Sequence, residues 1–270
     1  MTLLFNITLV ASVAALVLSC AGMASGRRTP GLLATLCIVV GTAALTGFIG
    51  WRWIEAGRAP FSDMFESLTL VAWVMMAIFL PIRMKAGIAA LETAVILLVV
   101  ATLAYASAFE SDIKPLMPAL RSNWLTGHVL ACMLGYGGFA VSFLSAIGFV
   151  IYDWLVRMGA AGNAEKVRDS FESVTARTIF FGFLFLSFGI VTGSVWANVA
   201  WGSYWSWDPK ETWSLITWFV YAAYLHCRFM RGWGGRLAAW IAIAGFISVL
   251  VTYFGVNYLS IMKGLHSYAQ

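Results

Sequence analysis

Long apolar runs, separated by short polar breaks, make up most of this chain. A helix that crosses a bilayer needs about 20 predominantly apolar residues, and each run is close to that length or longer. The pattern therefore predicts membrane-spanning helices rather than a globular domain with an apolar core. The expected segments are residues 2–22, 31–51, 65–82, 87–108, 123–156, 177–199, 211–230 and 236–260.

The order of these runs predicts one membrane domain. The run at 123–156 is longer than a single span needs, which predicts a helix that tilts or protrudes. No internal repeat and no low-complexity linker divides the sequence. We therefore expect residues 1–270 to form a single polytopic domain, an all-α bundle of about eight transmembrane helices with a tryptophan-rich extracytoplasmic loop at 196–213.

Composition agrees with this reading and excludes some functions. The chain is 61% hydrophobic and 11% charged, whereas soluble domains are about 25% charged. The net charge of +5 comes from short clusters between apolar runs and forms no patch, so it does not indicate nucleic acid. The four cysteines show no CxxC spacing, which favours small buried residues over thiol–disulfide exchange.

The basic residues predict the orientation. Short loops rich in Lys and Arg stay on the cytoplasmic side, and alternate breaks hold eleven and six of the seventeen basic residues. Both termini and the tryptophan loop are then extracytoplasmic. The richer set is Arg27, Arg28, Arg83, Lys85, Arg157, Lys166, Arg168, Arg177, Arg228, Arg231 and Arg236. The poorer set is Arg52, Arg58, Lys114, Arg121, Lys210 and Lys263.

The polar break at 201–213 holds four of the thirteen tryptophans and a tyrosine, with Trp196 just upstream. Interfacial anchoring explains one or two rings at a helix end, but not this density. A cluster of rigid rings with N–H donors suits a large, flat, amphipathic ligand. Gly202 lets the backbone turn sharply or approach such a ligand closely. The candidate rings in the break are Trp201, Trp205 and Trp207.

The three histidines lie at different predicted depths. His128 is near the outer end of the run at 123–156, and His266 follows the last run on the same side. His226 lies near the inner end of the run at 211–230, about 22 Å deeper at 1.5 Å per residue. His128 and His266 can therefore face each other across the tryptophan loop, whereas His226 cannot reach the same ligand atom.

Neutral imidazole is the usual nitrogen ligand of haem iron, so two outer histidines beside an aromatic platform predict a haem site. A histidine at a membrane boundary is also a common interfacial or hydrogen-bonding group. The two outer histidines bracket the loop, which favours iron ligation by His128 and His266. His226, beside Cys227, also fits a polar residue near the cytoplasmic headgroups.

The segment that closes the loop is a helix-start signal. Asp208 suits the N-cap position, Pro209 the first helical position and Glu211 the third, in capping-box spacing. The helix N-terminus carries partial positive charge, and Lys210 adds a full charge. Both can receive carboxylates such as haem propionates, with indole N–H groups as further donors.

These motifs resemble the CcsA/ResC proteins of System II cytochrome c biogenesis, within the haem-handling group named for its WWD motif. The motif stands as WGSYWSWD at 201–208 and continues as PKETW to 213. The likeness covers about residues 60–270 and is most specific from residue 192 onward. It is also carried by PFSDMFES at 60–67, NWLTGH at 123–128, TGSVWAN at 192–198, YFGVN at 253–257 and GLHSY at 264–268.

The resemblance implies a haem-handling subunit of the System II cytochrome c synthase in a bacterial cytoplasmic (inner) or thylakoid membrane. His128 and His266 would be axial ligands of an external haem b, held as substrate or cofactor against the tryptophan loop. His226 would be a ligand at a deeper site, through which haem passes outward. The implied partners are a CcsB/ResB-like membrane protein and an apocytochrome c, whose two CxxCH thiols add to the haem vinyl groups.

Three other functions remain open at this stage. A CcmC-like protein of System I shares the tryptophan motif but delivers haem to a chaperone without thioether formation. A bis-histidine b-type cytochrome would want paired histidines at both depths, and only His226 lies near the inner side. A transporter or scaffold without haem leaves the clustered rings and outer histidines unexplained. Heterologous expression and absorption spectroscopy separate this last reading from the others.

Overall fold

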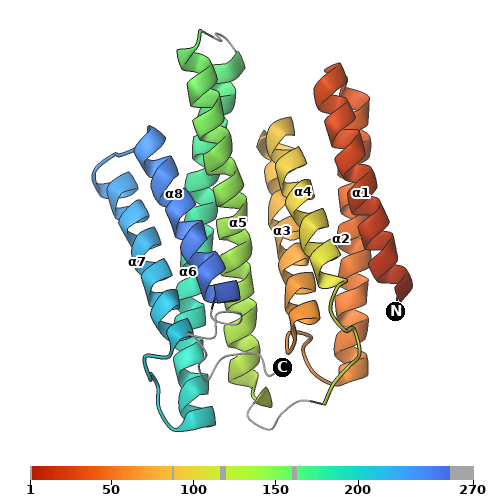
Figure 1. The fold of residues 1–270 in the computed structure, drawn as a ribbon. Coiled ribbons are helices and arrows are strands. Elements are labelled where there is room, and N and C mark those ends of the chain that lie inside the picture. Colours follow the sequence, from red (N-terminus) through yellow and green to blue (C-terminus); the bar gives the residue numbers. More distant parts are fainter. Residues whose placement is uncertain (1, 87, 116–119, 160–162, 256–270) are drawn as a thin grey trace. The chain divides into compact units, whose positions relative to one another are not determined.

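The computed structural model describes residues 2–86, 88–115, 120–159 and 163–255, and these residues form helices and connections without a β-strand. Figure 1 shows the long helices. The elements are α1 (Thr2–Ser25), α2 (Arg28–Ala56), α3 (Met64–Ala86), α4 (Ala89–Ala106), α5 (Asn123–Arg157), α6 (Asn163–Trp201), α7 (Pro209–Met230), α8 (Gly235–Leu250) and a short π-helix, η2 (Val251–Gly255). The predicted all-α fold is confirmed.

Seven of these helical segments are long and apolar enough to cross a membrane. They are α1 to α6 and the continuous segment Gly235–Gly255. The remaining helix, α7, coincides with the predicted run at 211–230 but is less apolar, because Lys210, Glu211 and Arg228 lie in its end turns. The architecture is that of a multi-pass α-helical membrane protein.

The start of α6 differs from its prediction. The expected helix began at residue 177, whereas α6 begins at Asn163. The additional turns carry many charges, yet Phe171 and Thr175 on their inner face are buried. Ser145 Oγ of α5 also donates to the Phe171 carbonyl at 2.8 Å. Packing of this face against α5 keeps a polar segment helical, which is common for amphipathic helices.

The helices fall into two compact units, residues 1–115 and residues 116–270. The first unit contains α1 to α4, and the second contains α5 to α8 with η2. The sequence-based expectation of a single membrane domain stays a prediction. Within the first unit, the acidic Glu92 of α4 forms an ion pair with Arg83 of α3, a partner that the sequence does not reveal.

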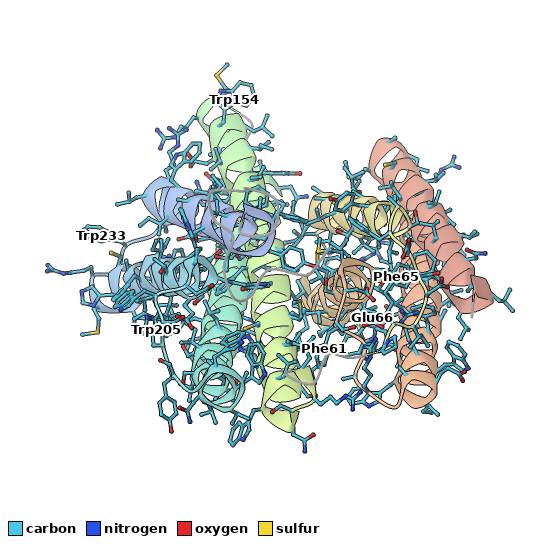
Figure 2. All side chains as sticks on the ribbon, turned by 60° about the horizontal axis from the view of Figure 1, so that its bottom comes forward. Phe61, Phe65, Glu66, Trp154, Trp205 and Trp233 are labelled. Carbon is cyan, nitrogen blue, oxygen red and sulfur yellow. The ribbon has the colours of Figure 1, made fainter. Side chains whose placement is uncertain are left out.

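A buried ion cluster joins several segments of the first unit. Glu66, in the first turn of α3, binds Arg52 Nε at 2.8 Å and Arg58 at 2.9 Å. The Ser62 amide also donates to this carboxylate at 2.8 Å. Arg52 in turn donates to the Ser111 carbonyl at 2.7 Å and lies over the Phe65 ring. Phe65 and Glu66 are labelled on α3 in Figure 2. The cluster ties the end of α2 to the start of α3 and to the segment after α4.

Glycines bring α5 and α6 into close contact in the second unit. A Cβ at Gly138 of α5 would lie 3.0 Å from the Thr178 carbonyl oxygen of α6. A Cβ at Gly182 of α6 would lie 2.7 Å from the Phe139 ring. Small residues of this kind allow membrane helices to approach closely. In Figure 1, the start of α5 and the connection between α6 and α7 lie at the same end of this pair.

Candidate functional site

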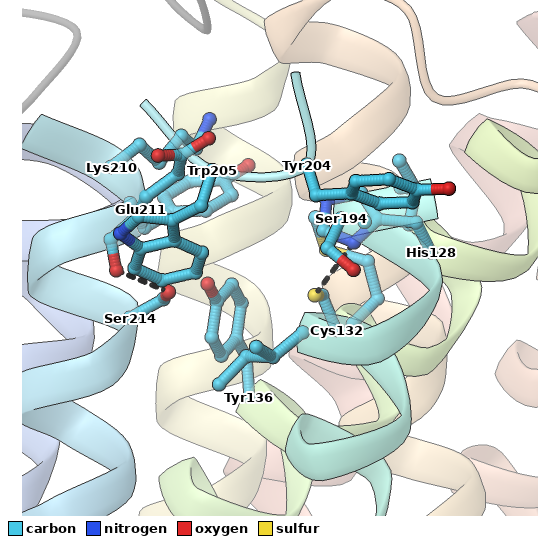
Figure 3. A pocket seen from close by; sticks show the side chains of 14 residues that line it. His128, Cys132, Tyr136, Ser194, Tyr204, Trp205, Lys210, Glu211 and Ser214 are labelled. Carbon is cyan, nitrogen blue, oxygen red and sulfur yellow. Dashed lines mark hydrogen bonds between the residues drawn. The ribbon is translucent and has the colours of Figure 1, made fainter. Parts of the chain in front are cut away.

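A pocket with a cavity volume of about 80 Å³ opens within the second unit, among α5, α6, the start of α7 and η2. Cofactor pockets typically combine apolar walls with a few polar groups. This pocket has both features (Figure 3). Its lining residues are His128, Val129, Cys132, Met133, Tyr136, Ile190, Gly193, Ser194, Tyr204, Trp205, Lys210, Glu211, Ser214 and Tyr253.

The capping box at the start of α7 holds one wall of the pocket. Asp208 is the N-cap residue, and its side chain accepts from the Lys210 amide at 2.9 Å. The Glu211 carboxylate accepts from the Asp208 amide at 3.2 Å and from the Ser206 amide at 2.8 Å. The predicted cap is confirmed. Because it ties the loop to α7, it fixes the positions of Trp205 and Lys210 beside the pocket.

Four indole rings form two contacting pairs, one at the end of α6 and one in the connection between α6 and α7, so part of the predicted loop at 196–213 is helical. Trp201 packs on Trp196 with a centroid distance of 4.7 Å, and Trp205 packs on Trp207 at 5.8 Å. Trp196 is buried, whereas Trp207 is 69% exposed. Gly202 turns the backbone with φ 76° as expected, and Trp207 has φ 58°. A bulky residue rarely adopts this left-handed conformation, so the loop holds the exposed Trp207 ring at a cost in backbone strain.

His128 is held in the pocket wall by contacts to α6. Its Nδ1 lies 2.7 Å from the Gly189 carbonyl oxygen. Its ring also stacks on Trp196, with a centroid distance of 6.1 Å and an interplanar angle of 15°. Trp196 therefore supports the histidine from behind and does not line the pocket.

Polar groups gather on the opposite wall. The indole Nε1 of Trp205 is buried and has no hydrogen-bond partner among the described residues. Lys210 and Ser214 of α7 line the same cavity. A buried donor without a partner costs free energy that an incoming acceptor would recover. This wall is therefore suited to an oxygen-bearing group of a ligand.

The predicted site residues are brought together only in part. His128, Trp205 and Lys210 line one pocket. Trp196, Trp201, Trp207, Asp208 and Gly202 support or flank it through the contacts described above. His226 is exposed near the far end of α7 and does not line the pocket. His266 lies outside the described residues.

Several lining residues were missed by sequence reasoning. Cys132 and Tyr136 follow His128 at intervals of four residues on α5 and therefore share its face. That spacing is visible in the sequence and could have identified both residues as neighbours of His128. Tyr253 enters from η2, where its ring packs on Tyr136 at a centroid distance of 6.3 Å. No sequence pattern indicates this contact, because it depends on how α8 ends against α5.

Fold and site together define a class: a multi-pass helical membrane protein with a pocket that is lined by one histidine, His128, and one indole ring, Trp205. The sequence model of the family described as "Cytochrome C assembly protein" matches residues 61–266. A solved structure titled "Cytochrome c Heme Lyase CcmF" has the same fold, with a TM-score of 0.71 at 17% identity. That match covers 93% of this chain and 46% of the other chain.

Curated relatives carry the name "Cytochrome c biogenesis protein CcsA". The relative from Gloeobacter violaceus is 36% identical, over 91% of this chain and 89% of its own length. The relative from a Synechococcus species is 39% identical, over 90% of this chain and 90% of its own length. The relative from Prochlorococcus marinus is also 39% identical, over 91% of this chain and 86% of its own length. The chain therefore belongs to the cytochrome c assembly protein family and is of CcsA type, as the motifs indicated.

Proposed function

We propose that this chain is the haem-handling subunit of a System II cytochrome c synthase. It would hold reduced haem b in the pocket at the outer membrane face, for thioether attachment to apocytochrome c. The single observation that carries the proposal is the pocket itself, in which His128 and the WWD-motif ring Trp205 line one cavity. Imidazole is the usual haem ligand, and flat rings suit a porphyrin face.

The residue types that line the pocket suit a haem. His128 would hold the haem iron together with His266, as the sequence resemblance implies. The buried Nε1 of Trp205 and the ammonium of Lys210 would bind the propionates. The eleven-to-six distribution of basic residues supports the outer location, in which both termini would also lie outside. His226 would serve a separate, deeper haem site.

The chemistry that this arrangement supports is positioning rather than nucleophilic catalysis. Each cysteine thiol of the CxxCH motif adds across one vinyl group: a C–S bond forms at one carbon, and the thiol hydrogen ends on the other. The substrate supplies both nucleophiles, so this chain has to hold the ring plane and the iron. Such positioning contributes about 7–11 kcal/mol to a joining reaction. A CcsB/ResB-like membrane protein would complete the synthase.

The test is covalent haem attachment in a heterologous host without its own pathway. The chain, a CcsB/ResB-like partner and a CxxCH reporter are expressed together, and reporter haem is assayed after denaturation. We expect covalent haem only when all three are present. Haem bound to the chain without thioether formation would instead support a haem-delivery role. Electron transfer through stable haem, again without thioether formation, would support a b-type cytochrome.

Trp205→Phe tests the polar wall of the pocket. The change keeps an aromatic ring but removes the buried N–H, which has no partner among the described residues. We expect the variant to retain haem about 10–150-fold less well, since a hydrogen bond to a charged group contributes about 1.5–3 kcal/mol. Protein yield should be unchanged. Haem per protein is measured after purification and washing, with Trp233→Phe, far along the chain in the α7–α8 connection, as the matched control.

A further inference from the structure

The imidazole of His128 lies against a notch in α6. A Cβ built at Gly193 would lie 2.5 Å from Nδ1 and 2.7 Å from Cε1 of this ring. Real Cβ atoms essentially never approach so closely. One turn earlier, a Cβ at Gly189 would lie 2.6 Å from Cys132 Sγ. Glycine at these two positions therefore allows His128 and Cys132 to lie directly on the α6 backbone.

The notch also determines which nitrogen of His128 carries the proton. The Gly189 carbonyl, 2.7 Å from Nδ1, has no hydrogen to donate, so Nδ1 must be the donor. Cys132 Sγ lies 3.7 Å from the same nitrogen, as a second and weaker contact. In a neutral ring the lone pair is then on Nε2. Metal-bound histidines are commonly oriented by a hydrogen bond of this kind.

We propose that Gly193 and the Gly189 carbonyl are positioning elements for haem ligation. Gly193 leaves room for the ring, and the carbonyl selects the tautomer that presents Nε2 to iron. The inference rests on the proposed function, because it assumes that His128 is a ligand. The contact at Gly193 differs from ordinary helix packing. A Cβ at Gly138 or Gly182 would meet backbone atoms or a phenylalanine ring, whereas a Cβ at Gly193 would meet the imidazole itself.

Gly193→Ala tests the inference directly. The methyl group would push the ring away from the carbonyl and weaken the Nδ1 hydrogen bond. We expect about 10–100-fold weaker haem retention, the usual cost of losing such a partner. The haem that remains should have a higher reduction potential, because a less basic imidazole stabilises Fe(III) less well. If Gly193 had only a structural role, the reduction potential of the remaining haem would not change. Gly127→Ala is the matched control, since a Cβ there meets nothing within 4 Å.

A second background keeps the test decisive if Gly193→Ala folds poorly. In His128→Gly the ring is removed, and supplied imidazole can replace it without a covalent link to the chain. Adding Gly193→Ala to this variant should then cost little further haem, because a free imidazole can move away from the added methyl group. If Gly193→Ala lowers haem retention equally in the presence and in the absence of the His128 ring, the inference is overturned. A Gly193→Ala protein with normal haem retention and potential would also overturn it.

The proposed function and this inference fail in different ways. Full haem in His128→Ala would contradict the ligand assignment, and the positioning inference would fall with it. Lost haem in His128→Ala with an unaffected Gly193→Ala would leave the ligand in place and overturn only the positioning role.

Discussion

Replacing His128 with alanine is expected to lower the haem that copurifies with this protein by at least about 10-fold, since even the loss of a ligand's supporting hydrogen bond typically costs 10–100-fold in affinity. His128 lies in the wall of the pocket with its ring fixed by the Gly189 carbonyl and Trp196. Formation of holocytochrome should fall with the haem. The measurements are haem per purified protein and covalent haem on a CxxCH reporter.

Supplied imidazole provides the internal control for this prediction. Because alanine leaves the imidazole space empty, free imidazole should enter and restore part of both signals. Gly127→Ala, at the neighbouring residue, should behave as the unmodified protein, since a Cβ there meets open space. If His128→Ala retains all of its haem and activity, His128 is not a ligand. A loss that imidazole does not reverse would indicate a folding defect instead.

Glu66→Gln is expected to be the most destabilising of these changes. The Glu66 carboxylate is fully buried and pairs with Arg52, whose side chain is 1% exposed, and with Arg58. Neutralising it leaves a buried guanidinium without its counter-charge. Breaking a buried pair from one side costs about 3–5 kcal/mol. The free energy of unfolding in mild detergent, from a denaturant titration followed by tryptophan fluorescence, measures this loss.

Two further variants show whether the loss comes from the unpaired charge. Arg52→Met with Glu66→Gln should be more stable than Glu66→Gln alone, because the double change also removes the buried cation. Glu110→Gln breaks an exposed pair with Lys114 and should leave stability unchanged. A double variant less stable than Glu66→Gln would mean that Arg52 stabilises the fold mainly through its bonds to the chain after α4.

The helices were predictable because the bilayer requires long apolar segments. The runs at 31–51 and 123–156 correspond to α2 and α5, with ends that differ by a few residues. The early start of α6 was not predictable from hydrophobicity, since residues 163–176 are polar overall. Their helical state depends on Phe171 and Thr175 packing on α5, a contact that only the tertiary fold supplies.

The parts of the candidate site that were predictable are those whose residues lie close together in the sequence. The Asp208 cap and the clustered rings are visible in one segment, and His128 was placed correctly at the same end of α5 as that loop. The notch at Gly193 was not predictable, because a four-residue glycine spacing does not say which side chain it receives. The partners of Glu66 and Glu92 were likewise hidden, since Arg52 and Arg83 reach them from other helices.

The most direct test of the central claim is the reduced-state absorption spectrum of the purified chain, coexpressed with a CcsB/ResB-like partner, beside its His128→Ala variant. We predict a low-spin haem spectrum with two histidine ligands, which is lost or converted to high spin in the variant. An unmodified protein without haem, or a variant with an identical spectrum, would contradict the claim that this pocket holds haem through His128.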